Sequence, residues 1–130
     1  MPTEAEWEYA CRAGGKHSYC GSDNYDSVAW YGDNSGGKTH ATAGKQANAW
    51  GLYDMSGNVH EWLEDCWNAN YKGAPSDGSA WTKGDCKRRV FRGGSWEDKG
   101  RYLTWASWRG GSSLVNRSRS IGFRLARTLF

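Results

Sequence analysis

The middle of the chain reads Trp50-Gly-Leu-Tyr-Asp-Met-Ser-Gly-Asn-Val-His-Glu-Trp62. Gly57 followed by Asn58 is typical of a tight turn, because both residues tolerate a left-handed backbone. After the turn, two sets of side chains alternate: Val59, Glu61 and Leu63 on one side, and His60, Trp62 and Glu64 on the other. This alternation has the period of a β-strand. The sequence therefore predicts a turn that leads into a strand over Asn58–Leu63.

A helix is predicted near the start of the chain. Thr3 and Glu6 have the spacing of a capping box, in which the two side chains satisfy backbone N–H groups at a helix start. Apolar side chains then recur at the i, i+3 and i+4 spacing of one helical face: Trp7, Ala10 and Cys11. The glycines at positions 14–15 are expected to end this helix.

The remaining sequence indicates a folded domain with much ordered loop. The chain has 130 residues, of which 18 are Gly and 9 are Trp, and such an aromatic content argues against disorder. Loops are predicted at residues 21–26, 32–38, 73–79 and 108–113. Between them lie four strand candidates: Val28–Tyr31, Asn58–Leu63, Arg89–Arg92 and Ser120–Leu125. We expect a single α+β domain over residues 1–130, with one clear helix and few short strands.

Composition excludes some classes of protein and partner. No apolar run approaches the roughly 20 residues of a membrane-spanning helix, and the first residues lack the features of a signal peptide. Residues 1–82 hold 5 basic and 11 acidic groups, whereas residues 83–130 hold 12 basic and 3 acidic groups. The halves can neutralise each other, or the second can form a basic face. Nucleic acid is not the favoured partner, since no nucleic-acid-binding motif accompanies the basic residues.

The four cysteines allow two disulfides in three connectivities, or four reduced thiols in a cytosolic protein. Cys66 and Cys86 bracket a stretch rich in Gly, Ser and Asp, so closing that loop would restrict the unfolded chain. We favour Cys66–Cys86, with Cys11–Cys20 as the second pair. The compartment is extracytoplasmic if the disulfides form and cytoplasmic otherwise. Without a CxxC pair, a structural zinc site is not expected.

Four blocks in order carry a family resemblance, and they span nearly the whole chain: Pro2-Thr-Glu-Ala-Glu-Trp-Glu-Tyr-Ala10, Trp50 to Trp62, Arg92-Gly-Gly-Ser-Trp96 and Ile121-Gly-Phe-Arg-Leu-Ala126. Together they closely resemble the formylglycine-generating enzyme family, also called the sulfatase-modifying factor domain. The resemblance implies that family's variant of the C-type lectin fold. Because family domains are about twice as long, residues 1–130 resemble the C-terminal half. A half-domain without a partner would leave apolar surface uncovered, which favours self-association or association with an N-terminal half-domain.

The resemblance does not carry the family's oxidation chemistry over to this chain. Catalytic members oxidise a sulfatase cysteine to formylglycine with copper held by two thiolates, and soft sulfur ligands suit Cu(I). Those cysteines follow the Gly-Gly-Ser-aromatic block, and Asp98 and Leu103 stand at their positions here. The stretch from Glu97 to Arg109 contains no cysteine. Copper is therefore not expected, although the oxidase remains an alternative. The family's iron-dependent sulfoxide synthases take His ligands from a domain that these residues do not contain.

A calcium site of the family is matched well. By resemblance, Asp54 and Glu61 supply carboxylate oxygens, and Gly57 and Val59 supply backbone carbonyls. Calcium takes six to eight oxygen ligands, so this donor set is chemically suitable. The alternative is a turn and strand whose acidic side chains are merely solvated. Asn58 is expected to hold the turn through bonds to the backbone.

The loop after Trp96 lies, by resemblance, where catalytic members bind substrate peptide. It offers residue types that are enriched in binding hot spots, together with an acid: Asp98, Arg101, Tyr102, Trp105, Trp108 and Arg109. The two tryptophans can equally be core residues. The favoured hypothesis is a calcium-stabilised, non-catalytic binding module for a protein, peptide or glycan. The alternatives are a formylglycine-generating oxidase and a structural fragment that completes a domain by association.

Overall fold

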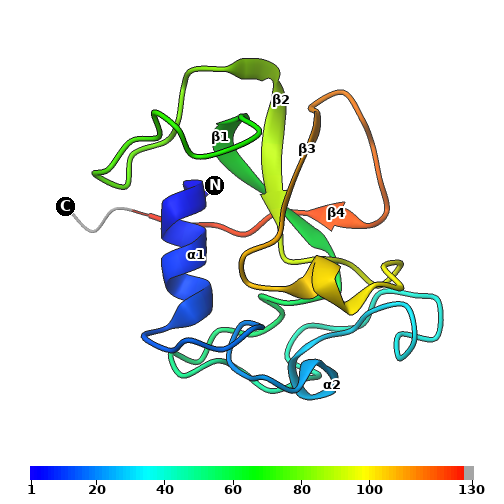
Figure 1. Cartoon of the computed structure of the whole chain (residues 1–130). Helices are drawn as coiled ribbons and strands as arrows, with labels where there is room; N and C mark the ends of the chain where they lie inside the picture. Colours follow the sequence, from blue (N-terminus) through cyan, green and yellow to red (C-terminus); the bar gives the residue numbers. More distant parts are fainter. Residues whose placement is uncertain (128–130) are drawn as a thin grey trace.

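The computed structural model describes residues 1–127, and its regular elements are few and short (Figure 1). The helices are α1 (Glu4–Arg12), α2 (Tyr25–Val28) and a 3-10 helix at Arg101–Thr104. The strands are β1 (His60–Trp67), β2 (Asp85–Arg92), β3 (Arg109–Ser113) and β4 (Ile121–Gly122). Long loops connect them, so the predicted α+β class with much ordered loop is confirmed. Within residues 1–127, the structure has no helix long and apolar enough to cross a membrane.

The strands form one sheet with the order β3-β2-β1-β4. β1 pairs with β2 and β2 with β3 in antiparallel fashion, whereas β4 joins β1 in parallel, with His60 opposite Ile121. The β1–β2 register shifts between Trp62 and Cys66, which marks a bulge in that pair. After β4 the chain also reaches the loop that precedes β1, where Arg124 donates to the Tyr53 carbonyl.

The first helix forms as predicted. The Thr3 hydroxyl accepts a hydrogen bond from the Glu6 N–H, and the Glu6 carboxylate accepts one from the Thr3 N–H. Two N–H groups that have no partner within the helix are thereby satisfied. The helix ends at Arg12, because Ala13 adopts a left-handed conformation before the two glycines are reached.

Two local predictions were wrong. Val28–Tyr31 is not a strand: the short helix α2 ends at Val28, and the Asn24 side chain caps its start by accepting from the Asp26 N–H. Residues 109–113, predicted as loop, form strand β3 instead. The strand predicted at Ser120–Leu125 is reduced to the two residues of β4.

Strand β3 owes its position to its two glycines. A Cβ atom on Gly111 would lie 2.5 Å from the Trp67 ring, and one on Gly110 would lie 2.6 Å from the Phe91 ring. Only a residue without a side chain lets the β3 backbone approach these rings. The glycines that suggested a loop in the sequence therefore permit close packing of a strand against aromatic side chains.

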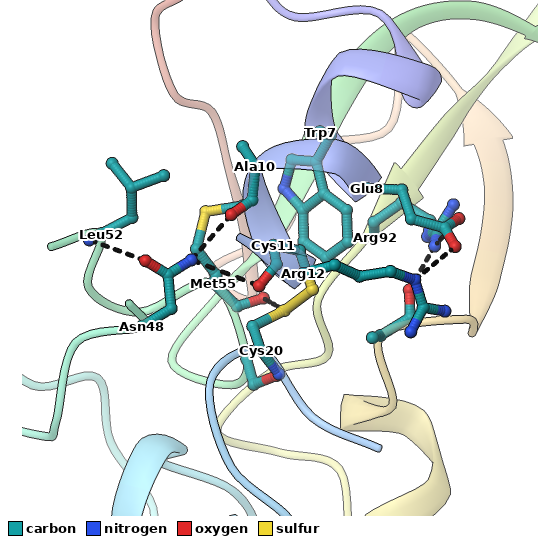
Figure 2. Close-up of a disulfide and its surroundings, with 12 residues drawn as sticks. Trp7, Glu8, Ala10, Cys11, Arg12, Cys20, Asn48, Leu52, Met55 and Arg92 are labelled. Carbon is teal, nitrogen blue, oxygen red and sulfur yellow. Dashed lines mark hydrogen bonds and ion pairs between the residues drawn. A yellow bond between two sulfur atoms is a disulfide. The ribbon is translucent and has the colours of Figure 1, made fainter. Parts of the chain in front are cut away.

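The core lies between α1 and the sheet. Its buried members include both cysteines of one disulfide: Trp7, Cys11, Cys20, Met55, Leu63, Val90 and Ala106. Figure 2 shows this Cys11–Cys20 bridge beneath the Trp7 ring, and Asn48 hydrogen-bonded to the carbonyls of Ala10 and Cys11 at the end of α1. The second bridge joins Cys66 to Cys86, as predicted from the composition of the stretch between them.

A buried ionic network ties α1 to strands β2 and β3. Arg92, with no exposed surface, pairs with Glu4 at 2.7 Å and with Glu8 at 2.8 Å, and it also donates to the Ala106 carbonyl. Arg109 pairs with Glu4 at 2.6 Å. Removing either partner of such a network leaves a buried charge uncompensated, which is strongly destabilising.

Candidate functional site

The turn before β1 has a backbone that few residues can adopt. Asp54, Gly57 and Asn58 all have positive φ, of 56°, 76° and 67°. A Cβ on Gly57 would lie 2.4 Å from the Trp30 carbonyl oxygen, so glycine is required there. As expected, the Asn58 side chain bonds to the backbone: it accepts from the His40 N–H and donates to the His40 carbonyl. The turn is therefore held against the loop that precedes it.

The Asp54 carboxylate is buried and only half satisfied. Its Oδ2 accepts a hydrogen bond from the Ala43 N–H at 2.9 Å, while its buried Oδ1 has no partner among the described residues. A buried carboxylate oxygen without a partner is costly. Asp54, Val59 and Glu61 line one open cavity of about 400 Å³, together with Phe123 and other residues that follow β4 or precede the turn. A cation in this cavity would satisfy the unpaired oxygen.

Glu61 is held by two donors, from opposite ends of the chain. Its Oε2 accepts from the Trp7 indole N–H at 2.7 Å and from Arg124 Nε at 2.9 Å, and its Oε1 accepts from Arg124 Nη2 at 2.7 Å. Burial alone would lower the pKa of Arg124, but the bonds to Glu61 and the nearby charge of Asp54 raise that pKa. The guanidinium is thus a permanent cation close to Asp54 and Glu61, the two carboxylates predicted to bind calcium.

Within the described part of the chain, a hard cation in this cavity would have only two carboxylates to bind. Among residues 1–127, no three His, Cys, Asp or Glu side chains form a cluster that could bind a metal. A calcium ion here would therefore take Asp54 and Glu61 as its carboxylates and fill its shell with backbone carbonyls and water. The Arg124 guanidinium shares the Glu61 carboxylate, so calcium binding has to work against its positive charge. Of the four predicted ligands, Gly57 does not line the cavity, although it lies in the same turn.

His60, the first residue of β1, forms a second polar pair with Asp98. His60 Nε2 lies 3.1 Å from Asp98 Oδ2, which also accepts from the Ser95 N–H at 2.8 Å. Burial alone would raise the pKa of Asp98, but the bond to His60, the charge of His60 and the Ser95 N–H hold that pKa below its usual value. His60 is buried against Phe91 and Trp108.

The two positions that correspond to the family's copper ligands hold no sulfur. Asp98 is engaged with His60 and Ser95, and Leu103 lies in the 3-10 helix with no donor atom in its side chain. All four cysteines are joined in disulfides, and no cysteine is free. Because Cu(I) binding in this chemistry depends on thiolates, these residues do not fit a copper ion.

The structure divides the loop residues predicted to bind ligand into two sets. Arg101, Tyr102 and Trp105 are exposed, with Trp105 at 44%. The Trp105 indole donates to the Tyr19 hydroxyl at 3.2 Å, so that its ring is held in place. Asp98, Trp108 and Arg109 are turned inward and serve in the packing: His60 contacts Asp98 and Trp108, and Glu4 binds Arg109. One compact exposed surface remains, and it consists of the first set.

Sequence reasoning gave no role to Arg124 or to the burial of His60. Arg124 belongs to the Ile121–Ala126 block, but nothing in the sequence shows that the parallel β1–β4 pairing places it on Glu61. The strand alternation places His60 and Trp62 on one face, and this shared face was the one indication in the sequence that His60 could be buried. The burial of that face depends on Phe91 and Trp108, which lie on or beside other strands.

Comparison with known proteins finds a matching family model and several similar proteins. A family model described as "Sulfatase-modifying factor enzyme 1-like domain" matches residues 1–129. The chain is 37% identical over 117 residues to "Chaperone protein LppX" of Paenibacillus barcinonensis, covering 74% of this chain and 38% of that protein. It is 33% identical over 120 residues to formylglycine-generating enzyme of Bos taurus, covering 74% and 29%. It is 30% identical over 143 residues to "Inactive C-alpha-formylglycine-generating enzyme 2" of the same species, covering 97% and 43%.

Two solved structures share the fold and a substantial part of the sequence. PvdO from Pseudomonas aeruginosa matches with a TM-score of 0.82 and 37% identity, over 95% of this chain and 50% of that chain. Treponema denticola variable protein 1 matches with a TM-score of 0.84 and 38% identity, over 95% and 45%. The chain thus spans half or less of the length of these relatives. Active and inactive enzymes both occur among its similar proteins.

Proposed function

The chain belongs to the sulfatase-modifying factor family, and on that premise we propose that it is a non-catalytic binding module, stabilised by calcium, for a protein, peptide or glycan. Its binding surface is the exposed part of the loop that follows Trp96. The family holds both active and inactive enzymes, so function has to be argued from the site itself.

The observation that carries the proposal is the chemistry at positions 98 and 103. A carboxylate bound to His60 and a hydrocarbon side chain stand where the oxidase holds copper between two thiolates. A thiolate cannot be recruited from elsewhere in the sequence without breaking a disulfide, because all four cysteines are paired. The residues that remain on this surface bind rather than oxidise.

The exposed surface suits a ligand with a flat or apolar face. Tyr102 and Trp105 have ring centroids 6.4 Å apart with nearly perpendicular planes, and Arg101 lies beside them over the Tyr25 ring. Tyr, Trp and Arg side chains contribute large contact areas and hydrogen bonds at binding hot spots. The hydrogen bond from Trp105 to Tyr19 reduces the ordering that ligand binding would require.

Calcium would be held at the turn, with Asp54 Oδ1 and the Glu61 carboxylate as anionic ligands and the carbonyls of Gly57 and Val59 completing the protein's share. The unpaired buried Oδ1 supports this assignment. When bound, calcium would neutralise Asp54 and link the turn to β1, and it would thereby stabilise the folded state. Glu61 would then be shared between the calcium ion and Arg124.

Oxygen consumption on a cysteine-containing peptide, with copper titrated into the protein, tests the absence of catalysis directly. We expect no turnover and no formylglycine in the mass spectrum of the peptide. Formylglycine formed in proportion to the protein would overturn the proposal in favour of the oxidase alternative.

Binding is tested on arrays of glycans and of peptides, probed with the chain and with its Trp105→Ala variant. We expect wild-type binders to be lost on substitution, because Trp105 supplies the largest exposed ring of the surface. Trp50→Ala is the matched control: Trp50 is similarly exposed, at 49%, but it packs on Tyr9 of α1. Equal losses in both variants would remove the loop from the proposal.

Association remains a second candidate because apolar side chains are exposed around β4. Phe123 and Leu125 follow this strand, and Leu125 is 81% exposed. An N-terminal half-domain or a second copy covering them would bury that surface. Sedimentation velocity of residues 1–130 tests the second copy directly: a dimer supports self-association, and a monomer excludes it.

A further inference from the structure

The two disulfides lie in opposite environments. Cys11 and Cys20 are both buried in the core, and Figure 2 shows their bridge close to Trp7 and Met55. The other bridge is asymmetric: Cys66 is 1% exposed, whereas Cys86 is exposed at the start of β2. Only Cys86 can be reached by a molecule in solution.

A cation lies against the buried sulfur of the asymmetric bridge. Arg89 Nη1 is 3.0 Å from Cys66 Sγ, and the same nitrogen donates to the Glu64 carbonyl at 3.0 Å. The pairing of β1 with β2 places Arg89 opposite Cys66, so the contact follows from strand register. A guanidinium stabilises a neighbouring thiolate and lowers the pKa of the corresponding thiol.

We propose that Cys86 is a thiol-exchange site, at which an external thiolate opens the Cys66–Cys86 bridge and forms a mixed disulfide on Cys86. The attacking sulfur bonds to Cys86 Sγ, the bond between the two cysteine sulfurs breaks, and its electron pair leaves on Cys66 Sγ as a thiolate. The external thiol is oxidised and Cys66 is reduced, so electrons balance without a further reagent. A second thiolate can then release Cys86.

Two features of the site favour this direction of attack. A thiolate has to reach the sulfur that it attacks, and of the two residues of this bridge only Cys86 is exposed. The sulfur that leaves is then Cys66, the one beside Arg89. A buried thiolate is otherwise disfavoured by desolvation, and the guanidinium offsets that cost where the charge develops. Accessibility and leaving-group stabilisation therefore select the same reaction.

The first experiment treats the native chain with glutathione, quenches with iodoacetamide and assigns each cysteine by mass spectrometry. We expect glutathione on Cys86 and the alkyl label on Cys66, while Cys11 and Cys20 stay joined. Glutathione on Cys66, or opening of Cys11–Cys20 at the same rate, would overturn the proposal. Because it uses the wild-type chain, this readout does not depend on the stability of a variant.

The second experiment measures the role of Arg89 through the rate of opening. Arg89→Gln removes the cation that stabilises the leaving thiolate, and because a leaving thiol of higher pKa departs more slowly, we expect the rate of opening to fall several-fold. Arg89→Lys keeps the charge and is expected to retain most of the rate. Lys87→Gln is the control, since it removes one positive charge from an exposed neighbour of Cys86. Equal rates in the Arg89→Gln and Lys87→Gln variants would contradict the assignment of Arg89.

Neither experiment involves the loop after Trp96 or the calcium ligands. Failure of the exchange reaction would leave the binding module as it stands, and failure of the binding module would leave the exchange site as it stands.

Discussion

Removing each disulfide in turn sets loop entropy against core packing. The Cys66–Cys86 bridge closes 20 residues and the Cys11–Cys20 bridge closes 9. The chain-entropy relation gives about 3.3 kcal/mol for the longer loop and about 2.6 kcal/mol for the shorter one. Loop length alone therefore predicts that the Cys66→Ala/Cys86→Ala variant loses more stability.

Core packing offsets that difference. Cys11 and Cys20 both belong to the buried cluster, so their replacement by Ala removes two sulfur atoms from a packed interior. If each is worth about 1 kcal/mol, close to the value for a buried methylene, the shorter bridge contributes about 4.6 kcal/mol before any cavity cost. In the other pair only Cys66 is buried, so the same allowance brings the longer bridge to about 4.3 kcal/mol. We therefore expect the Cys11→Ala/Cys20→Ala variant to lose at least as much stability as the Cys66→Ala/Cys86→Ala variant.

Urea unfolding followed by tryptophan fluorescence measures both losses, because the nine tryptophans include Trp7 directly above the core disulfide. The slope of the unfolding free energy against urea is needed for each variant, since a lost cross-link changes the denatured state. A loss larger by about 0.7 kcal/mol in the Cys66→Ala/Cys86→Ala variant, the difference that loop length alone gives, would refute the contribution of packing.

Three further outcomes test the site. Millimolar calcium is expected to raise the Tm of the wild type by several degrees and to leave the Tm of the Asp54→Asn variant unchanged. The control is Asp33→Asn, at an exposed position, whose Tm should rise like that of the wild type. Thermal unfolding with and without calcium measures all three. The pKa of Asp98 is lowered in the folded state, so the ionised side chain stabilises the fold above about pH 4 and this contribution is lost on acidification. The difference in unfolding free energy between the wild type and Asp98→Asn should therefore shrink from pH 7 to pH 3. A difference that stays constant over this range would contradict the assigned pKa shift. Gly57→Ala should cost about 2 kcal/mol more than Gly36→Ala in urea unfolding, because both have positive φ but only Gly57 faces a backbone oxygen, at 2.4 Å.

Local signals predicted the elements whose causes are local. The capping box of Thr3 and Glu6 needs only residues three apart, and the helix formed where it indicated. The turn at Gly57 and Asn58 was likewise readable, because positive φ restricts which residues can stand there. The strand at β1 was recognised by its alternation but extends to Trp67, four residues beyond the predicted end. Its extra length is paired with β2, which is a contact between distant segments.

Elements that depend on distant partners were not predicted. Gly110 and Gly111 signal a loop by composition, and they become a strand only because the rings of Phe91 and Trp67 occupy the space where side chains would be. The inward position of Arg109 depends on Glu4, which is 105 residues away. The same holds for Arg124, which binds Glu61 because β4 pairs with β1 in parallel. A loop composition that suggested a binding surface therefore contributed half of its residues to packing.

His60 and Asp98 form one structural unit near this surface. Asp98 stands at the first position that the resemblance assigns to a copper ligand, and its Oδ2 lies 3.1 Å from His60 Nε2. A carboxylate in this half-buried place needs a donor, and the Ser95 N–H supplies only one bond to it. The His60 imidazole supplies the second, on a ring that packs against Phe91 and Trp108. Replacing either residue alone would therefore leave the other without this hydrogen bond.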